Sequence, residues 1–257
     1  MKPRLNTEKR ERNELLGREE TLLGALLHDD ALRAQIDAGM GRPREPMSVW
    51  TDSDQSHSET LLQPCELPAW EQLSERMKIF IGFDAAMEFG WCFSFSANIC
   101  PDMVRRWSDE GSDFIGNIGQ RLRRAMAQKG IADIPFCYVV EARTKSGKTR
   151  TKPHIHGIAI CDQVLDATRI KLALESAFAG KMELKQRRKA AWVRRSYAKY
   201  GDPMGRFRWT TYITKNAHLY DARLGRRRIF MSRSYNQVAR IAWAVRRDDQ
   251  LARRQLS

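Results

Sequence analysis

Several short segments of the chain are rich in aromatic and β-branched residues and predict a set of β-strands. Residues 89–97 alternate aromatic and small side chains, and residues 136–141 form a short apolar run. A third strand is predicted over 154–161, after a basic and polar loop at 143–152. A short last strand is predicted over 229–232.

Apolar residues recur at helical spacing between and after these segments. Ser112 and Asp113 can cap one helix and Asp166 a second, because short polar side chains accept hydrogen bonds from the first backbone amides of a helix. The apolar faces of these helices are Ile115, Ile118, Leu122 and Met126, and Ile170, Leu172, Leu174 and Phe178. The other stretches predicted to be helical are 181–195, 209–216 and 236–246. This order predicts an α+β fold, with an antiparallel sheet and helices packed mainly on one face.

The first 75 residues differ in composition from the rest of the chain. Residues 1–39 are charged and predicted to be helical, and residues 39–64 have the glycine, proline and polar content of a linker. Residues 1–75 carry 9 Lys/Arg against 15 Asp/Glu, whereas residues 76–257 carry 36 against 16. We therefore divide the chain into an acidic, helical or partly disordered region (1–75) without an assigned role and a basic domain (76–257). The basic excess predicts a polyanionic partner.

Neither a membrane span nor a secretory signal is predicted. No apolar run approaches the roughly 20 residues of a membrane helix, and the chain starts with charged rather than apolar residues. The five cysteines are widely spaced and form no Cys-x-x-Cys pair, which argues against a zinc ribbon or a redox motif. Reduced cysteines acting as small hydrophobes indicate a cytoplasmic protein.

A His-x-His pair in the third predicted strand is the first candidate for chemistry. His154 and His156 project from the same strand face, where their imidazoles can hold one metal ion or merely pack. If Glu141 lies opposite His154 and Val139 opposite His156, Glu141 shares that face and can be the third ligand. A slip of one residue points Glu141 away, and the long loop leaves the register open. Such ligands suit Mg²⁺ or Mn²⁺, with Zn²⁺ or Ni²⁺ as other occupants.

A tyrosine and a lysine form the second candidate. Tyr212 and Lys215 are three residues apart and share one face of the helix predicted at 209–216. A phenol has a pKa near 10 and is a poor nucleophile unless cations stabilise the phenolate, which a lysine and a metal-bound phosphate can do. The alternative is a packing tyrosine beside a solvated lysine. The other tyrosines near this segment are interpreted as packing residues, namely Tyr197, Tyr200 and Tyr220.

Together, these residues resemble the motifs of the HUH endonuclease superfamily, and most of all its rolling-circle replication initiators. The resemblance covers roughly 89–246, and its motifs are Phe93–Ser96, Glu141, Lys152–Gly157 and Thr211–Asn216. The tyrosine follows the histidines, as in replication initiators and single-tyrosine transposases, whereas in relaxases it comes first. The positions four residues from Tyr212 are Arg208 and Asn216, so the resemblance is to enzymes with one catalytic tyrosine.

The resemblance implies a metal-dependent enzyme that nicks and joins single-stranded DNA through a 5′-phosphotyrosine intermediate. It implies His154, His156 and Glu141 as ligands of Mg²⁺ or Mn²⁺, and Tyr212 and Lys215 as catalytic residues. The expected partners are single-stranded DNA at a replication origin and the host replication machinery, in a bacterium or for its mobile element. With one tyrosine, termination requires a second protomer, a second strand transfer or hydrolysis, so a homo-oligomer is left open.

Basic residues of the domain are the candidates for holding the DNA strand. They are Lys145, Lys148, Arg150, Lys152, Arg194, Arg195, Arg208, Arg227 and Arg233. Trp192, Phe207 and Trp209 lie among these charges and can stack on bases or belong to the core, and core packing is predicted for Trp209. The competing functions are a single-tyrosine transposase with the same chemistry and a non-catalytic, basic nucleic-acid-binding protein.

Overall fold

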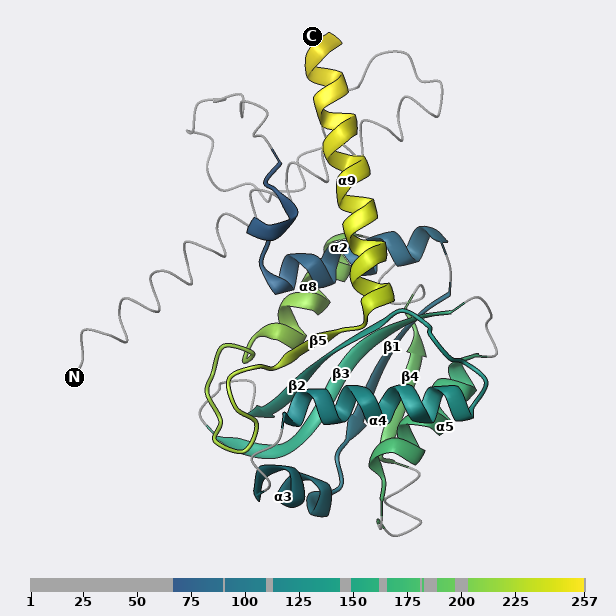
Figure 1. Ribbon diagram of the computed structural model, residues 1–257, viewed down its shortest axis with the longest axis vertical. Helices are drawn as coiled ribbons and strands as arrows, with labels where there is room; N and C mark the ends of the chain where they lie inside the picture. The colour runs from purple at the N-terminus through teal and green to yellow at the C-terminus, as the bar shows by residue number, and fades with distance from the viewer. Residues whose placement is uncertain are drawn as a thin grey trace, which may run out of the picture. The chain divides into compact units, whose positions relative to one another are not determined.

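The computed structural model divides the chain into two compact units, Met1–Ala69 and Trp70–Ser257. The residues it describes are 67–89, 91–109, 113–143, 149–161, 166–180, 182, 189–196 and 203–256 (Figure 1). The second unit begins at Trp70, before the division predicted between residues 75 and 76. The predicted N-terminal helix and linker lie outside the described residues, as do Lys145 and Lys148.

Five strands form one antiparallel sheet in the order β4-β1-β3-β2-β5. The strands are β1 (Trp91–Asn98), β2 (Phe136–Arg143), β3 (Arg150–Cys161), β4 (Ala191–Arg195) and β5 (Ile229–Met231). Strands β2 and β3 are longer than predicted, because their pairing continues into the basic segment between them and includes Arg143 and Arg150.

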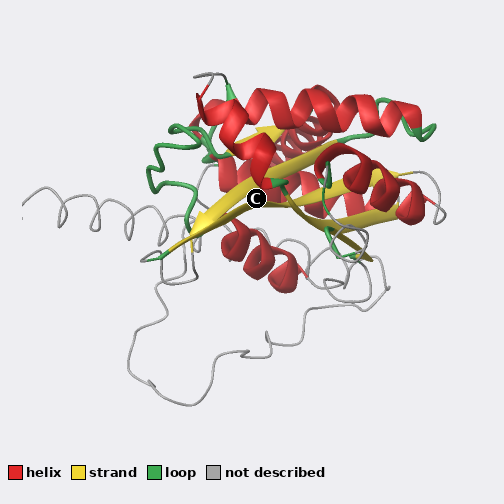
Figure 2. Ribbon diagram, turned by 90° about the horizontal axis from the view of Figure 1, so that it is seen from below, coloured by secondary structure: helices red, strands yellow, loops and turns green. Residues whose placement is uncertain are grey.

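Helices lie on both sides of the strands (Figure 2). The helical elements are η1 (Trp70–Gln72), α2 (Glu75–Phe89), α3 (Pro101–Asp109), α4 (Phe114–Gln128), α5 (Asp166–Phe178), α8 (Pro203–Thr214) and α9 (Arg233–Leu256). Residues of α4 and α5 form a core with one sheet face, and residues of α2, α8 and α9 with the other. The predicted α+β fold with an antiparallel sheet is thus confirmed, and the structure adds a second helical layer. No described helix is long and apolar enough to cross a membrane.

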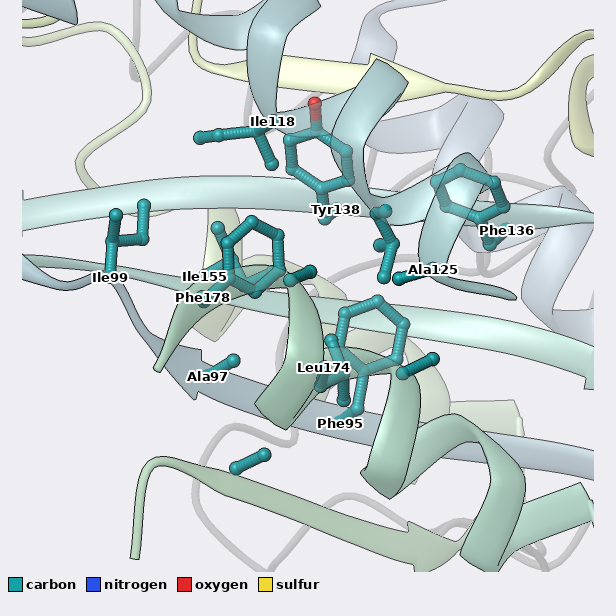
Figure 3. Close-up of a cluster of buried hydrophobic side chains, with 14 of the residues drawn as sticks. Phe95, Ala97, Ile99, Ile118, Ala125, Phe136, Tyr138, Ile155, Leu174 and Phe178 are labelled. Carbon is teal, nitrogen blue, oxygen red and sulfur yellow. The ribbon is translucent and has the colours of Figure 1, made fainter. Parts of the chain in front are cut away.

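The larger core lies between the sheet and helices α4 and α5 (Figure 3). The predicted apolar face of α4 is completely buried there, as are Ile170, Leu174 and Phe178 of α5. Leu172 is exposed, because it lies off the four-residue spacing of these three residues. Asp113 stands at the N-cap of α4 without a side-chain capping bond, and Asp166 is the first residue of α5 rather than its cap.

The sequence-based expectation lacked helices α2 and α3 and the short η1, and it assigned strand β4 to a helix. Helix α2 was not predicted, because it is buried on nearly all sides and therefore has no polar stripe to reveal its period. Residues 181–195 were predicted to be helical, but Ala191–Arg195 form edge strand β4. Ala191 and Val193 pack into the α4–α5 core, while charged neighbours remain exposed, which is typical of a protected sheet edge.

The described cysteines are Cys92, Cys100, Cys137 and Cys161, all buried as reduced thiols. Burial raises the pKa of Cys137 to about 12, so this thiol stays protonated at neutral pH. Burial also raises the pKa of Cys92 far above its ordinary value. These residues act as small hydrophobes, as predicted, whereas Cys65 lies outside the described residues.

A buried carboxylate joins the helices of the second layer. Asp84 of α2 accepts a hydrogen bond of 2.7 Å from Nε of Arg206 on α8, and it also pairs with Arg246 on α9. Asp84 and Arg206 are both buried. A buried ion pair of this kind holds its elements in register, because either charge left alone would be poorly solvated.

Replacing Asp84 with alanine should lower the free energy of unfolding by about 3–5 kcal/mol, since Arg206 would remain buried without its carboxylate. Urea unfolding followed by circular dichroism measures the effect. The control is Asp102→Ala, which removes an exposed carboxylate paired with Arg105 and should change stability by less than about 1 kcal/mol. Equal midpoints for the two variants would show that the Asp84 cluster does not stabilise the helical layer.

Candidate metal centre and nucleophile

The pairing of β2 with β3 brings three potential metal ligands together. Glu141 lies opposite His154, and Val139 opposite His156, so the register is the one that places Glu141 on the histidine face. Oε2 of Glu141 is 3.6 Å from Nε2 of His154 and 3.4 Å from Nε2 of His156. One ligand atom from each residue lies within 4.8 Å of the others. This Glu-His-His group can hold a metal ion.

The spacing of the donor atoms fits a divalent ion. Two ligands that are each about 2.1 Å from one ion lie about 3.0–3.4 Å apart in octahedral or tetrahedral coordination. The carboxylate–imidazole distances in the group are close to this range. Nε2 of His156 is shielded from solvent and makes no hydrogen bond of normal geometry within the described part of the chain. A cation between the ligands would satisfy this buried nitrogen.

Hydrogen bonds on the far side of the rings orient both imidazoles. Nδ1 of His154 lies 3.0 Å from the backbone oxygen of Lys152. Because a carbonyl only accepts, this nitrogen carries a proton, and Nε2 of the neutral ring is left to coordinate. Nδ1 of His156 lies 2.7 Å from Oγ of Ser96 on β1. Ser96 belongs to the motif Phe93–Ser96, but its contact with His156 could not be predicted without knowing that β1 pairs with β3.

Glu141 is 5% exposed and is held by two partners besides the histidines. Nζ of Lys215 is 2.6 Å from Oε1, and Nδ2 of Asn216 donates to the same oxygen at 3.0 Å. Burial by itself raises the pKa of Glu141, but the close interactions with His154, His156 and Lys215 outweigh burial and hold this pKa well below its usual value. The carboxylate is therefore charged at neutral pH, as a metal ligand must be. Asn216 had no assigned role in the sequence analysis.

The two histidines respond differently to this environment. Burial by itself would lower the pKa of both imidazoles. For His154 the interaction with Glu141 outweighs burial, and the pKa is raised. For His156 burial dominates, and the pKa is lowered, so this ring is neutral at pH 7 and able to bind a cation.

Helix α8 places Tyr212 beside the histidines. The side chain is 46% exposed, and its ring centroid is 6.1 Å from that of His156. Lys215 follows in the turn after α8, and its Nζ lies 3.8 Å from the centre of the tyrosine ring while it pairs with Glu141. The predicted shared face of Tyr212 and Lys215 is therefore present, although α8 begins at Pro203 and ends at Thr214 rather than spanning 209–216.

The other described tyrosines lack such surroundings. Tyr138 and Tyr235 are buried, and their hydroxyls donate to backbone oxygens at 2.5 and 2.7 Å. Burial raises the pKa of both phenols well above the usual value. Tyr220 is 61% exposed, which corrects its interpretation as a packing residue. Among the described residues, Tyr212 is the tyrosine whose ring meets a histidine of the group.

Four of the predicted DNA-binding residues lie on the histidine side of the sheet. Arg150 and Lys152 precede His154 on β3 at a spacing of two, so they share its strand face. Arg194 lies on that face of β4, and Arg208 is one helical turn before Tyr212 on α8. All four are exposed.

Three other predicted DNA-binding residues are not brought to the site. Arg195 lies opposite Phe93, whose side chain belongs to the α4–α5 core. Arg227 stacks on Phe230 on that same side, 6.0 Å from the ring centroid. Arg233 starts α9 and lines a pocket at the Phe136 end of β2, whereas Glu141 lies toward the other end.

The aromatic residues among the basic segments also separate. Phe207 is buried and packs edge-to-face on Phe80, with ring centroids 5.6 Å apart. Trp209 is half-buried, packs against the core of the second layer and meets Phe83 edge-to-face at the same centroid distance of 5.6 Å. Trp209 is thus a core residue, as predicted, and so is Phe207. Trp192 remains exposed on β4.

Comparisons of the chain with protein-family models, with curated proteins and with solved structures found no match.

Proposed function

We propose that the protein is a metal-dependent endonuclease that nicks and rejoins single-stranded DNA, as the replication initiator of a plasmid, a phage or a mobile element. One observation carries the proposal: an exposed tyrosine lies against a Glu-His-His group, with an ammonium in contact with both. Each part is common alone, but a nucleophile beside a cation site is an arrangement for attack on a phosphodiester. The exposed basic residues on this face supply the attraction for a nucleic acid.

The residues of the chain define the proposed chemistry. A divalent ion such as Mg²⁺ or Mn²⁺ held by Glu141, His154 and His156 would polarise a non-bridging phosphate oxygen. Tyr212 attacks the phosphorus, so that the bond from Oη to phosphorus forms as the bond to the 3′-oxygen breaks. The phenol loses its proton and the 3′-oxygen gains one, which leaves a 5′-phosphotyrosine and a 3′-hydroxyl. Lys215, whose Nζ lies over the tyrosine ring, would stabilise the negative charge that develops in the transition state of the attack.

The phosphotyrosine preserves a phosphodiester bond, so a 3′-hydroxyl can reverse the step and join strands. A released 3′-hydroxyl is also what a polymerase extends. These two properties make the same site useful for starting and finishing the copying of a circular element.

The test is a cleavage assay on randomised single-stranded oligonucleotides with Mn²⁺, using the full chain. Oligonucleotides labelled at the 3′-end should become covalently attached to the protein on a denaturing gel, whereas 5′-labelled fragments should be released. EDTA should abolish both products. Cleavage without a covalent species, or cleavage that persists in EDTA, would contradict the proposal.

Replacing Lys215 with methionine should lower the rate of adduct formation by about 10²–10³-fold, because the transition state loses a fixed positive charge. Metal affinity should be retained or raised, since a cation that competes for Glu141 is removed. Single-turnover kinetics measures the first quantity and titration calorimetry with Mn²⁺ the second. Lys171→Met, which removes an exposed lysine of α5, is the control. A parallel loss of metal binding would show that Lys215 only maintains the structure of the site.

A further inference from the structure

An exposed tryptophan and an arginine lie together on the edge strand of the sheet. Trp192 of β4 is 38% exposed, although large aromatic side chains are normally buried. Cζ of Arg194 lies 4.5 Å from the centre of the indole ring. The two residues are two apart in a strand and therefore share one face. Together they place a partly exposed indole ring and a guanidinium group, which lies over that ring, at the surface.

This pair lies on the same sheet face as the Glu-His-His group. On β1, Ser96 is opposite Trp192 on one side and opposite His156 on the other. Side chains at paired positions of neighbouring strands point to one face, so these three residues form a row across the sheet. Ser96 contacts His156 within this row. Two strand spacings of about 4.8 Å place Trp192 about 10 Å from His156.

The surroundings of the pair fit an unpaired nucleotide. An indole face stacks on any base, and a guanidinium beside it can contact the adjoining phosphate. The bases of a duplex are already stacked on one another, so the surface is open only to single-stranded nucleic acid. A DNA strand that runs across this sheet face from Tyr212 toward β4 would pass the Glu-His-His group and then reach Trp192 and Arg194.

We propose that Trp192 and Arg194 form a base-binding subsite beside the scissile phosphate, where an unpaired base stacks on the indole and Arg194 binds the neighbouring phosphate. The position beside a scissile phosphate rests on the proposed function, whereas the binding of an unpaired base does not. The subsite holds the DNA strand on the sheet face that carries the histidines, so that the phosphate under attack lies a short distance from the stacked base.

The test measures binding of a fluorescein-labelled oligothymidylate and of an abasic strand of equal length to the full chain in EDTA, by anisotropy. Trp192→Ala should weaken binding of the thymidylate about tenfold. The same variant should bind the abasic strand as the wild type does, because the phosphate contacts remain. Trp192→Phe should restore most of the thymidylate affinity. An equal loss on both strands would overturn the proposal, as would full affinity of Trp192→Ala for the thymidylate.

Two neighbouring arginines offer a matched control. Arg194→Met and Arg195→Met remove the same charge from adjacent positions, but Arg195 lies on the opposite face of the sheet. Arg194→Met should weaken thymidylate binding several-fold and reduce the slope of log K against log salt by about 0.7. Arg195→Met should leave the slope closer to that of the wild type. Equal effects of the two substitutions would contradict the assignment of Arg194.

The outcomes separate this inference from the proposed function. Binding in EDTA requires neither nicking nor Tyr212. Even if the protein never cleaves DNA, Trp192→Ala can therefore weaken binding of the thymidylate without weakening binding of the abasic strand. Conversely, a protein that nicks DNA but binds both strands equally well after Trp192→Ala retains the proposed function and lacks the subsite.

Discussion

Replacing Tyr212 with phenylalanine should abolish the covalent adduct between the protein and single-stranded DNA. The substitution removes one oxygen atom from a side chain that is 46% exposed, so the fold and the Glu-His-His group should be unchanged. Without the hydroxyl no phosphotyrosine can form, and the rate should fall to the background. The measurement is the denaturing-gel assay with 3′-labelled oligonucleotides and Mn²⁺, together with Mn²⁺ affinity by calorimetry, which should stay within about twofold of the wild type.

Tyr220→Phe is the matched control for this experiment. Tyr220 is the other exposed tyrosine among the described residues, and no described contact joins its ring to the metal ligands. It should therefore form the adduct at the wild-type rate. If Tyr212→Phe still forms the adduct and Tyr220→Phe does not, the nucleophile has been assigned to the wrong tyrosine. If neither forms it, Tyr220 is needed as well, which contradicts the expectation that Tyr212 alone serves the reaction.

The part of the site that could be predicted from the sequence is the part fixed by local geometry. The alternation of a strand places His154 and His156 on one face, and helical spacing places Tyr212 near Lys215. Whether Glu141 joins them depends on the β2–β3 register, which a long connecting loop does not determine. The structure has the register in which it does, because Glu141 lies opposite His154.

In the fold, too, the elements that could be predicted are those with a local sequence pattern. The predicted apolar faces of α4 and of most of α5 are buried, because each helix meets one sheet face. Helix α2 has no such stripe and was missed. The segment of strand β4 was predicted to be helical. The difference matters for function, because neighbouring residues of a strand point to opposite faces, which separates Arg194 from Arg195. The contacts of Ser96 and Asn216 arise only when distant segments meet, so local patterns could not reveal them.

Replacing both His154 and His156 with alanine should eliminate metal binding and nicking together. The pair supplies two of the three ligands, and a carboxylate alone, already paired with Lys215, is a weak site. Mn²⁺ binding should become undetectable by calorimetry, and the rate of adduct formation should fall by about 10³-fold or more. Both imidazoles are only partly buried, and Glu141 keeps Lys215 and Asn216 as partners, so the variant should still fold, which an unfolding curve checks.

Two further variants decide whether this loss reflects coordination. Ser96→Ala removes only the hydrogen bond that orients His156, so metal affinity should fall by a smaller factor, about 10–100-fold. His218→Ala removes an exposed histidine that is not part of the group and should leave metal affinity unchanged. A graded series, with His218→Ala unaffected, Ser96→Ala intermediate and the double variant without binding, is the pattern that coordination requires. Undiminished, metal-dependent nicking by the double variant would place the cation elsewhere and remove the link between this group and Tyr212.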